Sequence, residues 1–230
     1  MTQESTAPKH IAIIPDGNRR WATTKGLAAS MGHRKAVEEG RLRKLYQAAR
    51  SKGVECVTLW GFSTENWKRG ETEKKILFEL FEGLTDTLSS DLIDDKIRFI
   101  HVGRRDRLPE SLMSKLIQLE KDTSSFEGFT LCLALDYGGR DELTRAAQKL
   151  VNSNVAVTEE SLALALDTAK LPDLDLVIRT SGEQRLSGFM PFQSVYSELL
   201  FIDKYFPDFN VDDLVDAIDN FGKRGRRFGK

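Results

Sequence analysis

The sequence has few of the features that mark secreted, membrane-spanning or fibrous proteins. Only two of its 230 residues are cysteines, Cys56 and Cys132, and both lie in apolar stretches. We therefore expect buried free thiols in a reducing compartment rather than a disulfide framework. No apolar run approaches the roughly 18 residues of a membrane span, and residues 1–9 are polar and lack a signal-peptide core. These absences predict a soluble, cytoplasmic protein, with residues 1–9 flexible.

Net charge is also nearly absent. Lys and Arg together number 34 and Asp and Glu together 35, which gives a formal net charge of -1. We therefore expect no nucleic-acid partner, because such proteins usually carry a strongly basic surface. Local clusters remain: residues 17–35 contain five basic residues and no acid. A confined anion site is compatible with this pattern.

Short apolar runs alternate with amphipathic segments along the whole chain, which indicates alternating strands and helices. The predicted strands cover residues 11–16, 54–62, 96–102, 129–137, 174–178 and 199–202. The predicted helices cover residues 34–52, 76–92, 109–121, 140–152, 161–168 and 211–221. We therefore predict one α/β domain over residues 1–230, with a mostly parallel central sheet of about six strands surrounded by helices.

Four polar loops follow predicted strands. Ligands of parallel α/β sheets bind beyond the carboxyl ends of the strands, so these loops are where we expect the chemistry. They are residues 16–20, 63–67, 136–140 and 179–185.

The first of these loops combines a carboxylate, a glycine, an amide and two guanidiniums in residues 16–20. Glycine lets backbone amides approach an anion closely, and arginines match phosphate oxygens. The loop thus fits a diphosphate, although a solvated basic turn in which Asp16 only caps a helix is an equal alternative. It has neither GxGxxG nor GxxxxGK[ST], so the dinucleotide and Walker-type interpretations lack their motifs.

The loop after the fifth predicted strand places Arg179 and Arg185 on either side of a glycine turn, with Ser187 just beyond. Two guanidiniums and a hydroxyl suit a second diphosphate. The alternative is a surface ion-pair network with Glu183.

A sparse cation site is predicted from Asp16 and Glu198. Mg²⁺ is commonly bound by one or two carboxylates together with substrate phosphates and water. Zinc is not predicted, because the three histidines show no ligand spacing with the two cysteines. Those histidines are His10, His33 and His101.

The apolar face of residues 76–92 is open to two interpretations. Core packing is the simpler one. The alternative is that part of this face lines a channel for an apolar ligand, with Phe78, which lies off the main stripe, as a wall residue and Phe81 as a second bulky candidate.

Taken together, the loops resemble the cis-prenyltransferases, the isoprenyl transferase family that includes undecaprenyl diphosphate synthase. The motifs that carry the resemblance occur in order at residues 10–22, 32–34, 62–69, 136–142, 178–187 and 196–199. The resemblance implies a Mg²⁺-dependent homodimer that adds isopentenyl diphosphate to an allylic prenyl diphosphate, forming Z double bonds. It also implies a hydrophobic tunnel for the growing chain, and contact with membranes only through product delivery.

The resemblance assigns roles to matching positions. Asp16 and Glu198 are expected to bind Mg²⁺, and Asp16 and Asn66 to act in catalysis, Asn66 as a suggested proton acceptor. The allylic diphosphate is expected to bind Gly17, Asn18, Arg19, Arg20, His33 and Arg69. Isopentenyl diphosphate is expected to bind Arg179, Arg185 and Ser187. Further substrate contacts are expected from Trp21, Ser63, Thr64, Glu65, Trp67 and Leu186.

The resemblance implies special roles for two segments, one that closes over the substrate and one that reaches the active site of the dimer partner. Trp67 resembles the tryptophan of a mobile loop that closes over substrate. The tail at residues 222–230 resembles an element that reaches the dimer partner, where Arg227 and Gly229 would contribute to the neighbouring site.

The motifs also depart from the family pattern. Arg19 replaces a usual glycine, Ala29 a frequent arginine and Gly70 a common proline. These changes leave open the allylic primer and the product length, and whether the enzyme is a short-chain or irregular synthase of this fold. A non-catalytic partner subunit is a further alternative, but such subunits lack the loop at residues 16–18 that this chain retains. A nucleotide phosphotransferase would need a Walker loop.

Overall fold

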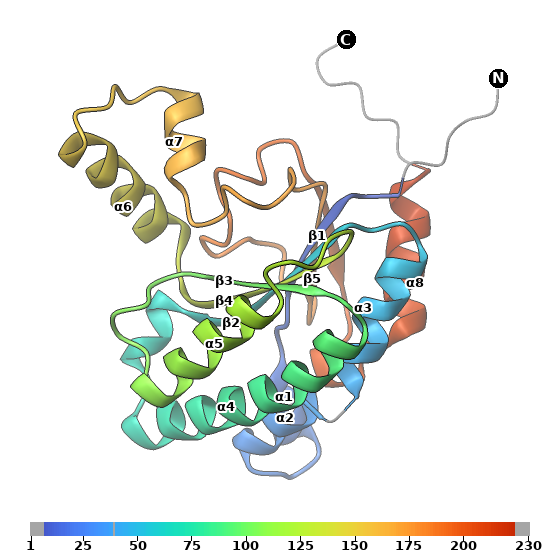
Figure 1. Cartoon of the computed structure of the whole chain (residues 1–230). Coiled ribbons are helices and arrows are strands. Elements are labelled where there is room, and N and C mark those ends of the chain that lie inside the picture. The colour runs from blue at the N-terminus through green and yellow to red at the C-terminus, as the bar shows by residue number, and fades with distance from the viewer. Residues whose placement is uncertain (1–6, 39, 224–230) are drawn as a thin grey trace, which may run out of the picture.

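A six-stranded parallel sheet forms the centre of the computed structural model, which describes residues 7–38 and 40–223 (Figure 1). Its strands are β1 (His10–Ile14), β2 (Cys56–Ser63), β3 (Arg98–Val102), β4 (Thr130–Tyr137), β5 (Leu176–Thr180) and β6 (Glu198–Ile202). Their order is β3-β4-β2-β1-β5-β6, and every neighbouring pair is parallel. The predicted α/β fold with about six mostly parallel strands is confirmed.

Eight α-helices lie in the described part of the chain. They are α1 (Asn18–Thr24), α2 (Ala29–Ala36), α3 (Arg41–Ser51), α4 (Glu71–Asp94), α5 (Glu110–Asp122), α6 (Gly139–Asn152), α7 (Glu159–Ala165) and α8 (Val211–Phe221). Two short 3-10 helices are η1 (Thr64–Lys68) and η2 (Phe206–Asp208). The single helix predicted over residues 34–52 is wrong, because α2 ends at Ala36 and α3 begins only after Gly40, whose φ of 71° interrupts the helix.

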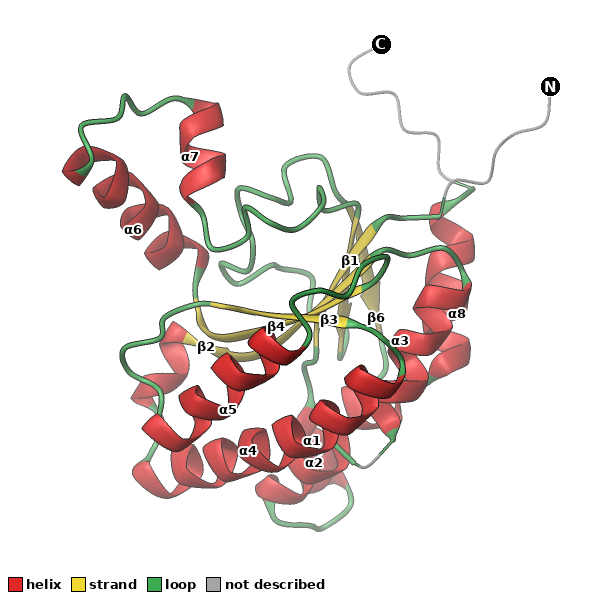
Figure 2. Ribbon diagram, in the orientation of Figure 1, coloured by secondary structure: helices red, strands yellow, loops and turns green. Residues whose placement is uncertain are grey.

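The larger hydrophobic core lies between one face of the sheet and α3, α4, α5 and α8, which Figure 2 shows together on one side. Alternation along β1 explains the division: Ile11 and Ile13 point into this core, whereas Ala12 and Ile14 pack into the opposite one. Strands covered on both faces become continuously apolar, as β1 is.

The second face of the sheet is covered mainly by an irregular segment, with α6 and α7 beside it (Figure 2). Phe189 of this segment is fully buried and stacks on Trp60 of β2, with ring centroids 4.6 Å apart. Gly139 permits this close approach, because a Cβ there would lie 2.0 Å from Cδ of Pro191. Packing thus fixes the segment that follows β5 on the sheet.

The structure also bears on the predictions made for the cysteines, the chain ends and a membrane span. Cys56 and Cys132 are buried free thiols, as expected, and burial raises the pKa of Cys132 to about 12. The backbone amide of Lys9 donates to the Asp175 carboxylate at 2.7 Å. Of residues 1–9, which were expected to be flexible, residues 1–6 lie outside the described residues, and so does the tail with Arg227 and Gly229. No helix of the described part is long and apolar enough to cross a membrane.

Candidate active site

A polar cavity of about 560 Å³ opens at the carboxyl edge of β1. Its charged and polar lining comes mainly from the loop after β1 and from α1, with contributions from α2 and from the segments after η1 and β6. The lining residues are Pro15, Asp16, Gly17, Asn18, Arg19, Arg20, Thr23, Thr24, His33, Arg69 and Tyr205. Six residues expected to bind the allylic diphosphate therefore meet in one cavity.

Gly17 shapes the floor of the polar cavity. Its φ is 91°, and a Cβ on it would lie 2.5 Å from Cδ1 of Tyr205 and 2.8 Å from Cβ of Ser181. Only glycine avoids both the backbone strain and the overlap. Helix α1 begins directly afterwards, and its first intrahelical bond runs from the Trp21 amide to the Gly17 carbonyl at 2.8 Å. The amides before Trp21 lie in the first turn, where backbone N–H groups favour an anion.

Asp16 is held at this edge by three donors. Its carboxylate accepts hydrogen bonds from the Gly17 amide at 2.6 Å, from Nη2 of Arg179 at 2.7 Å and from Nη2 of Arg20 at 3.4 Å. Burial raises the pKa of Asp16, but the hydrogen bonds from Arg179 and Gly17 outweigh it and hold the pKa below its usual value. Asp16 is therefore a carboxylate at neutral pH, and the interpretation as a mere helix cap does not describe it.

Arg179 is the buried guanidinium of the second loop, with only 5% of the residue exposed. Besides Asp16, it donates to the Ser187 hydroxyl at 2.9 Å and to the carbonyl oxygen of Arg185. Its Nε is buried and has no partner among the described residues. The fork thus retains a donor after joining the two loops.

The predicted alternative of an ion-pair network with Glu183 is realised for the exposed arginines. Arg185 pairs with Glu183, and Arg20 donates to the same carboxylate at 2.9 Å and to the Ser181 hydroxyl at 2.6 Å. The side chain of Arg185 is 58% exposed and does not line the polar cavity. Exposed pairs of this kind contribute little stability and exchange readily for another anion.

An apolar cavity of about 60 Å³ adjoins the polar one. Pro15, Asn18 and His33 line both cavities, so these residues form their junction. The rest of the lining is hydrophobic or aromatic, except for Gly61, and comes mainly from β2, β4, α2, α3, α4 and η2. These residues are Ala36, Val37, Leu42, Leu59, Trp60, Gly61, Leu77, Leu80, Phe81, Leu84, Leu133 and Phe206. Part of the α4 face therefore lines a cavity, as one of the two interpretations held.

Phe81, rather than Phe78, belongs to that wall. The ring of Phe78 instead contacts Phe62 and Trp67, with centroids 5.2 Å and 5.6 Å away. Phe78 lies off the main apolar stripe of α4 because its ring faces Trp67 of η1. The expectation that Phe78 lines the apolar cavity is therefore wrong for the described residues.

The junction carries two unsatisfied polar atoms. Oδ1 of Asn18 and Nε2 of His33 are both buried without a hydrogen-bond partner among the described residues. Burial, together with the nearby Arg69, lowers the pKa of His33 to about 4. At neutral pH the imidazole is therefore uncharged. Buried polar atoms without partners are costly, so the junction is suited to a polar ligand group.

The η1 segment has a different geometry from the one expected. Asn66 and Ser63 cap each other, and Oδ1 of Asn66 accepts from the Ser63 amide at 3.0 Å. Neither lines the polar or the apolar cavity. Thr64 donates to the exposed Glu65 at 3.1 Å and also faces Gly138, where a Cβ would lie 2.3 Å from its Oγ1. Of this segment and the residue after it, only Arg69 reaches the polar cavity.

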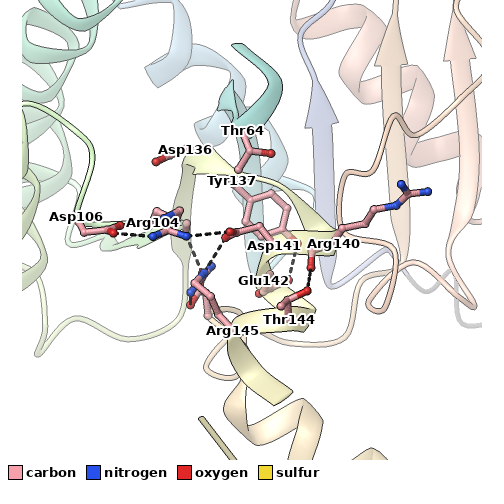
Figure 3. Close-up of polar contacts among 12 residues, drawn as sticks. Thr64, Arg104, Asp106, Asp136, Tyr137, Arg140, Asp141, Glu142, Thr144 and Arg145 are labelled. Carbon is pink, nitrogen blue, oxygen red and sulfur yellow. Dashed lines mark hydrogen bonds and ion pairs between the residues drawn. The ribbon is translucent and has the colours of Figure 1, made fainter. Parts of the chain in front are cut away.

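The turn between β4 and α6 is braced by a charged network (Figure 3). Arg104 donates to Asp141 at 3.1 Å, and Arg145 donates to the same carboxylate at 2.7 Å. Tyr137 donates its hydroxyl hydrogen to the buried Glu142 at 2.6 Å. The contact of Arg104 with Asp141 ties the first turn of α6 to the loop between β3 and α5, and that of Tyr137 with Glu142 ties it to the end of β4.

Three further predicted residues, Trp21, Leu186 and Glu198, also line neither cavity. Trp21 is buried and donates from Nε1 to Asp208 at 2.8 Å. Leu186 packs against the core on the second face of the sheet. Glu198 pairs in register with Leu176 at the start of β5.

Glu198 and Asp16 are therefore not brought together within one chain. Leu176 pairs with Ile11, so Glu198 lies level with Ile11 at the amino edge of the sheet. Asp16 lies beyond the carboxyl end of β1, and at about 3.3 Å per residue the two levels differ by roughly 16 Å. Within a single chain the two acids cannot share a cation.

Sequence reasoning missed Tyr205, Thr23 and Thr24 in the polar cavity. Tyr205 follows β6, so the rule that ligands bind at the carboxyl ends of strands could have found it. The two threonines carried no signal beyond their place on a short helix.

The donor set of the polar cavity fits Mg²⁺ as a cation that shares its ligands with a substrate. No group of three or more His, Cys, Asp or Glu within the described residues could hold a metal ion alone. Asp16 nevertheless offers an ionised carboxylate, and the unpartnered Oδ1 of Asn18 is a second hard oxygen in the same lining. Mg²⁺ commonly takes such a sparse set and completes its shell with phosphate oxygens and water.

Known proteins resemble this chain both in sequence and in fold. The family model described as "Putative undecaprenyl diphosphate synthase" matches residues 14–229. An isoprenyl transferase of Treponema denticola is 41% identical over 222 residues, which is 96% of this chain and 97% of the relative. An isoprenyl transferase of Thermotoga maritima is 40% identical over 227 residues, covering 96% of this chain and 97% of the relative.

Two solved structures share the fold. The lavandulyl diphosphate synthase from Lavandula x intermedia, in complex with dimethylallyl diphosphate, superposes with a TM-score of 0.92 at 33% identity, covering 97% of this chain and 99% of that one. A structure described as a probable undecaprenyl diphosphate synthase from Campylobacter jejuni superposes with a TM-score of 0.84 at 30% identity, covering 98% and 100%.

Proposed function

The chain belongs to the undecaprenyl diphosphate synthase, or isoprenyl transferase, family, and from this we propose that it is a Mg²⁺-dependent cis-prenyltransferase. It would condense isopentenyl diphosphate with an allylic prenyl diphosphate, giving a Z-polyprenyl diphosphate and releasing diphosphate. The observation that carries the proposal is the junction of a basic polar cavity with an apolar one at Asn18 and His33. An amphiphile with a diphosphate head and a hydrocarbon tail fits such a pair of cavities.

In the proposed reaction the allylic C–O bond breaks and the departing diphosphate keeps the electron pair. A new bond joins the allylic C1 to C4 of isopentenyl diphosphate, and the proton lost from C2 is taken up by an oxygen of the departing diphosphate. Arg19, Arg20 and Arg69 line the polar cavity, where negative charge grows on the leaving group. Guanidiniums at that place stabilise the negative charge that develops in the transition state.

The apolar cavity contributes by what it excludes. Leu77, Phe81 and Leu84 line it, and each is less than 8% exposed. Hydrocarbon walls offer no nucleophile to the positive allylic carbon, so the neighbouring alkene is its partner. Holding the two reactants in line supplies a large part of the acceleration.

We propose that Mg²⁺ would bind the carboxylate of Asp16 and Oδ1 of Asn18, together with oxygens of the diphosphate. When bound, the cation would supply positive charge to the leaving diphosphate. Arg179 fixes the orientation of the Asp16 carboxylate through the 2.7 Å hydrogen bond between them. Arg179 and Ser187 are proposed to bind isopentenyl diphosphate, with Arg185 released from Glu183.

A homodimer remains part of the proposal and gains a reason from the position of Glu198. Since Glu198 lies at the opposite edge of its own sheet from Asp16, a metal role for it requires a second copy of the chain. The cytoplasmic location expected from the sequence belongs to the same proposal, and so does the contribution of Arg227 and Gly229 to the partner's site.

The test is direct. The purified chain is incubated with labelled isopentenyl diphosphate, Mg²⁺ and allylic primers of several lengths, and the products are separated against length standards. We expect a prenyl diphosphate longer than the primer, and no product when Mg²⁺ is chelated. The absence of any longer product with every primer would refute the proposal.

A short-chain or irregular synthase is the second candidate. It is favoured by the small apolar cavity, about 60 Å³, and by the TM-score of 0.92 with a lavandulyl diphosphate synthase. The same chromatography separates the two candidates, because a short-chain enzyme stops after one condensation with dimethylallyl diphosphate.

A further inference from the structure

Asp136, near the end of β4, is a buried carboxylate at the centre of a polar cluster that the proposed mechanism does not use. Its side chain is fully buried and its φ is 50°, a conformation that non-glycine residues rarely adopt. Its carboxylate accepts from Nε1 of Trp67 at 2.7 Å and from Nε of Arg107 at 2.8 Å, and Nη2 of Arg107 completes a bidentate pair. We call Asp136, Arg107 and Trp67 the Asp136 cluster.

The indole of Trp67 is held on several sides. The guanidinium carbon of Arg107 lies 5.4 Å from the ring centroid, within the range of a cation–π contact. The rings of Phe62 and Phe78 lie 5.5 Å and 5.6 Å away. Arg107 therefore acts on Trp67 twice, directly through its face and indirectly by orienting Asp136.

The loop that carries Arg107 is itself fixed against β4. The Arg104 amide donates to the carbonyl oxygen of Asp136 at 3.1 Å. Gly103 has a φ of 120°, and a Cβ on it would lie 2.1 Å from the carbonyl oxygen of Leu135. No other residue fits at that point, so the loop passes close to the strand end. Figure 3 shows Arg104 and Asp136 at this end of β4.

Trp67 connects this cluster to the polar cavity through the backbone. Arg69 follows two residues later as the cap of η1, and its side chain lines the polar cavity. The tip of Arg69 pairs with Glu73 of α4 at 3.0 Å. Glu73 thus fixes the guanidinium end, while the position of η1 determines where the backbone of Arg69 begins.

We propose that Arg107 and Asp136 are positioning residues for the diphosphate site: by anchoring Trp67 they hold η1, and with it Arg69, in the geometry that binds the allylic diphosphate. The inference rests on the proposed function for the identity of the ligand. The physical basis is preorganisation, since a guanidinium already in place loses less freedom when the anion binds. Neither Arg107 nor Asp136 lines the polar cavity, so both act through Trp67.

Arg107→Met is the test variant, and Arg105→Met is its matched control. Arg105 lies in the same loop and makes a similar bidentate pair, with Glu120 at 2.7 Å and 2.8 Å, but is not part of the Asp136 cluster. We expect Arg107→Met to raise the KM for the allylic diphosphate about tenfold with kcat changed less, because preorganised binding is lost. Arg105→Met is expected to leave both constants near wild type.

A second readout reports on Trp67 without turnover. Titration with inorganic diphosphate, followed by tryptophan fluorescence, gives a dissociation constant for each variant, and Trp67→Phe identifies the contribution of Trp67. We expect Arg107→Met to weaken binding and to shift the Trp67 emission before diphosphate is added. Arg107→Lys restores charge but not the fork, so we expect only partial recovery.

The outcomes separate the two claims. If Arg107→Met lowers the melting temperature but leaves KM and the diphosphate dissociation constant unchanged, Arg107 is merely structural and the inference is wrong. Equal effects of Arg107→Met and Arg105→Met would also overturn it. If the wild-type chain binds diphosphate but forms no prenyl product, the proposed function fails, while the titration still decides the positioning role.

Discussion

The two cavities that meet at Asn18 and His33 are built on opposite principles. The polar cavity is lined by charged side chains that are partly exposed and paired with one another, as Arg20 is with Glu183. The apolar cavity is lined largely by side chains that are almost fully buried, such as Leu77 and Phe81. The first can exchange its internal partners for a ligand at little cost, whereas the second changes only if its packing changes. Binding is therefore expected to depend on the first and product size on the second.

The largest effect should come from removing the central carboxylate of the polar cavity. Asp16→Ala is expected to lower kcat at least about a hundredfold, because a preorganised charged group at the leaving diphosphate is lost. Product formation from labelled isopentenyl diphosphate measures it. Asp86→Ala, on the exposed surface of α4, is the control. A near-normal rate for Asp16→Ala would remove this residue from the mechanism.

Shortening the fork of Arg179 should have the next largest effect. Arg179→Lys keeps the charge but replaces the two nitrogens that bond Ser187 and Asp16 with a single one, so we expect the KM for isopentenyl diphosphate to rise about tenfold. Steady-state kinetics with isopentenyl diphosphate varied at a saturating allylic primer would show it. An unchanged KM would mean that Arg179 only braces the loops.

The apolar cavity is tested by Phe81→Leu. Removing part of the ring should destabilise the fold by about 1 kcal/mol and enlarge the cavity, so that longer products appear. Urea unfolding and product chromatography give the two readouts. Phe78→Leu, on the same helix but outside the lining, should leave product length unchanged. If Phe78→Leu lengthens the product and Phe81→Leu does not, the assignment of the wall is wrong.

The junction itself should show the smallest effect, in the pH dependence of stability. Because the pKa of His33 falls to about 4 in the folded state, the unfolded chain binds more protons between about pH 6.5 and pH 4. The contribution of His33 to the free energy of unfolding is therefore complete above about pH 6.5 and is lost as the pH falls towards 4. His33→Gln should reduce the loss between pH 7 and pH 5 by less than about 1 kcal/mol after allowance for partial exposure. Urea unfolding at the two pH values measures this, and an identical loss in both proteins would contradict it.

The sequence pattern was sufficient to predict the features that depend on neighbouring residues in the chain. The apolar alternation and the glycine turns predicted all six strands, and the loop chemistry located Asp16, Arg20 and Arg179 at one edge. Helix boundaries were less accurate, as the break before Arg41 shows, because a glycine with positive φ inside an amphipathic stretch looks like an ordinary helix residue.

Three features of the site could not be predicted from the sequence. The cap between Asn66 and Ser63, the lining role of Phe81 and the level of Glu198 each depend on contacts with other elements. A match to a family motif identifies the residue but does not say which atoms its side chain meets.

The sequence by itself determined the order of the strands, the six-stranded α/β class and the kinds of side chain available at the carboxyl edge, because these follow from backbone preference and hydrophobic period. Only the tertiary structure decided which of those side chains share a cavity. Strand register placed Glu198 at the far edge from Asp16, and packing brought Arg107 onto Trp67, 40 positions earlier in the chain. Both are long-range relations, set by the burial of apolar surface between elements and by the close approach that glycine allows.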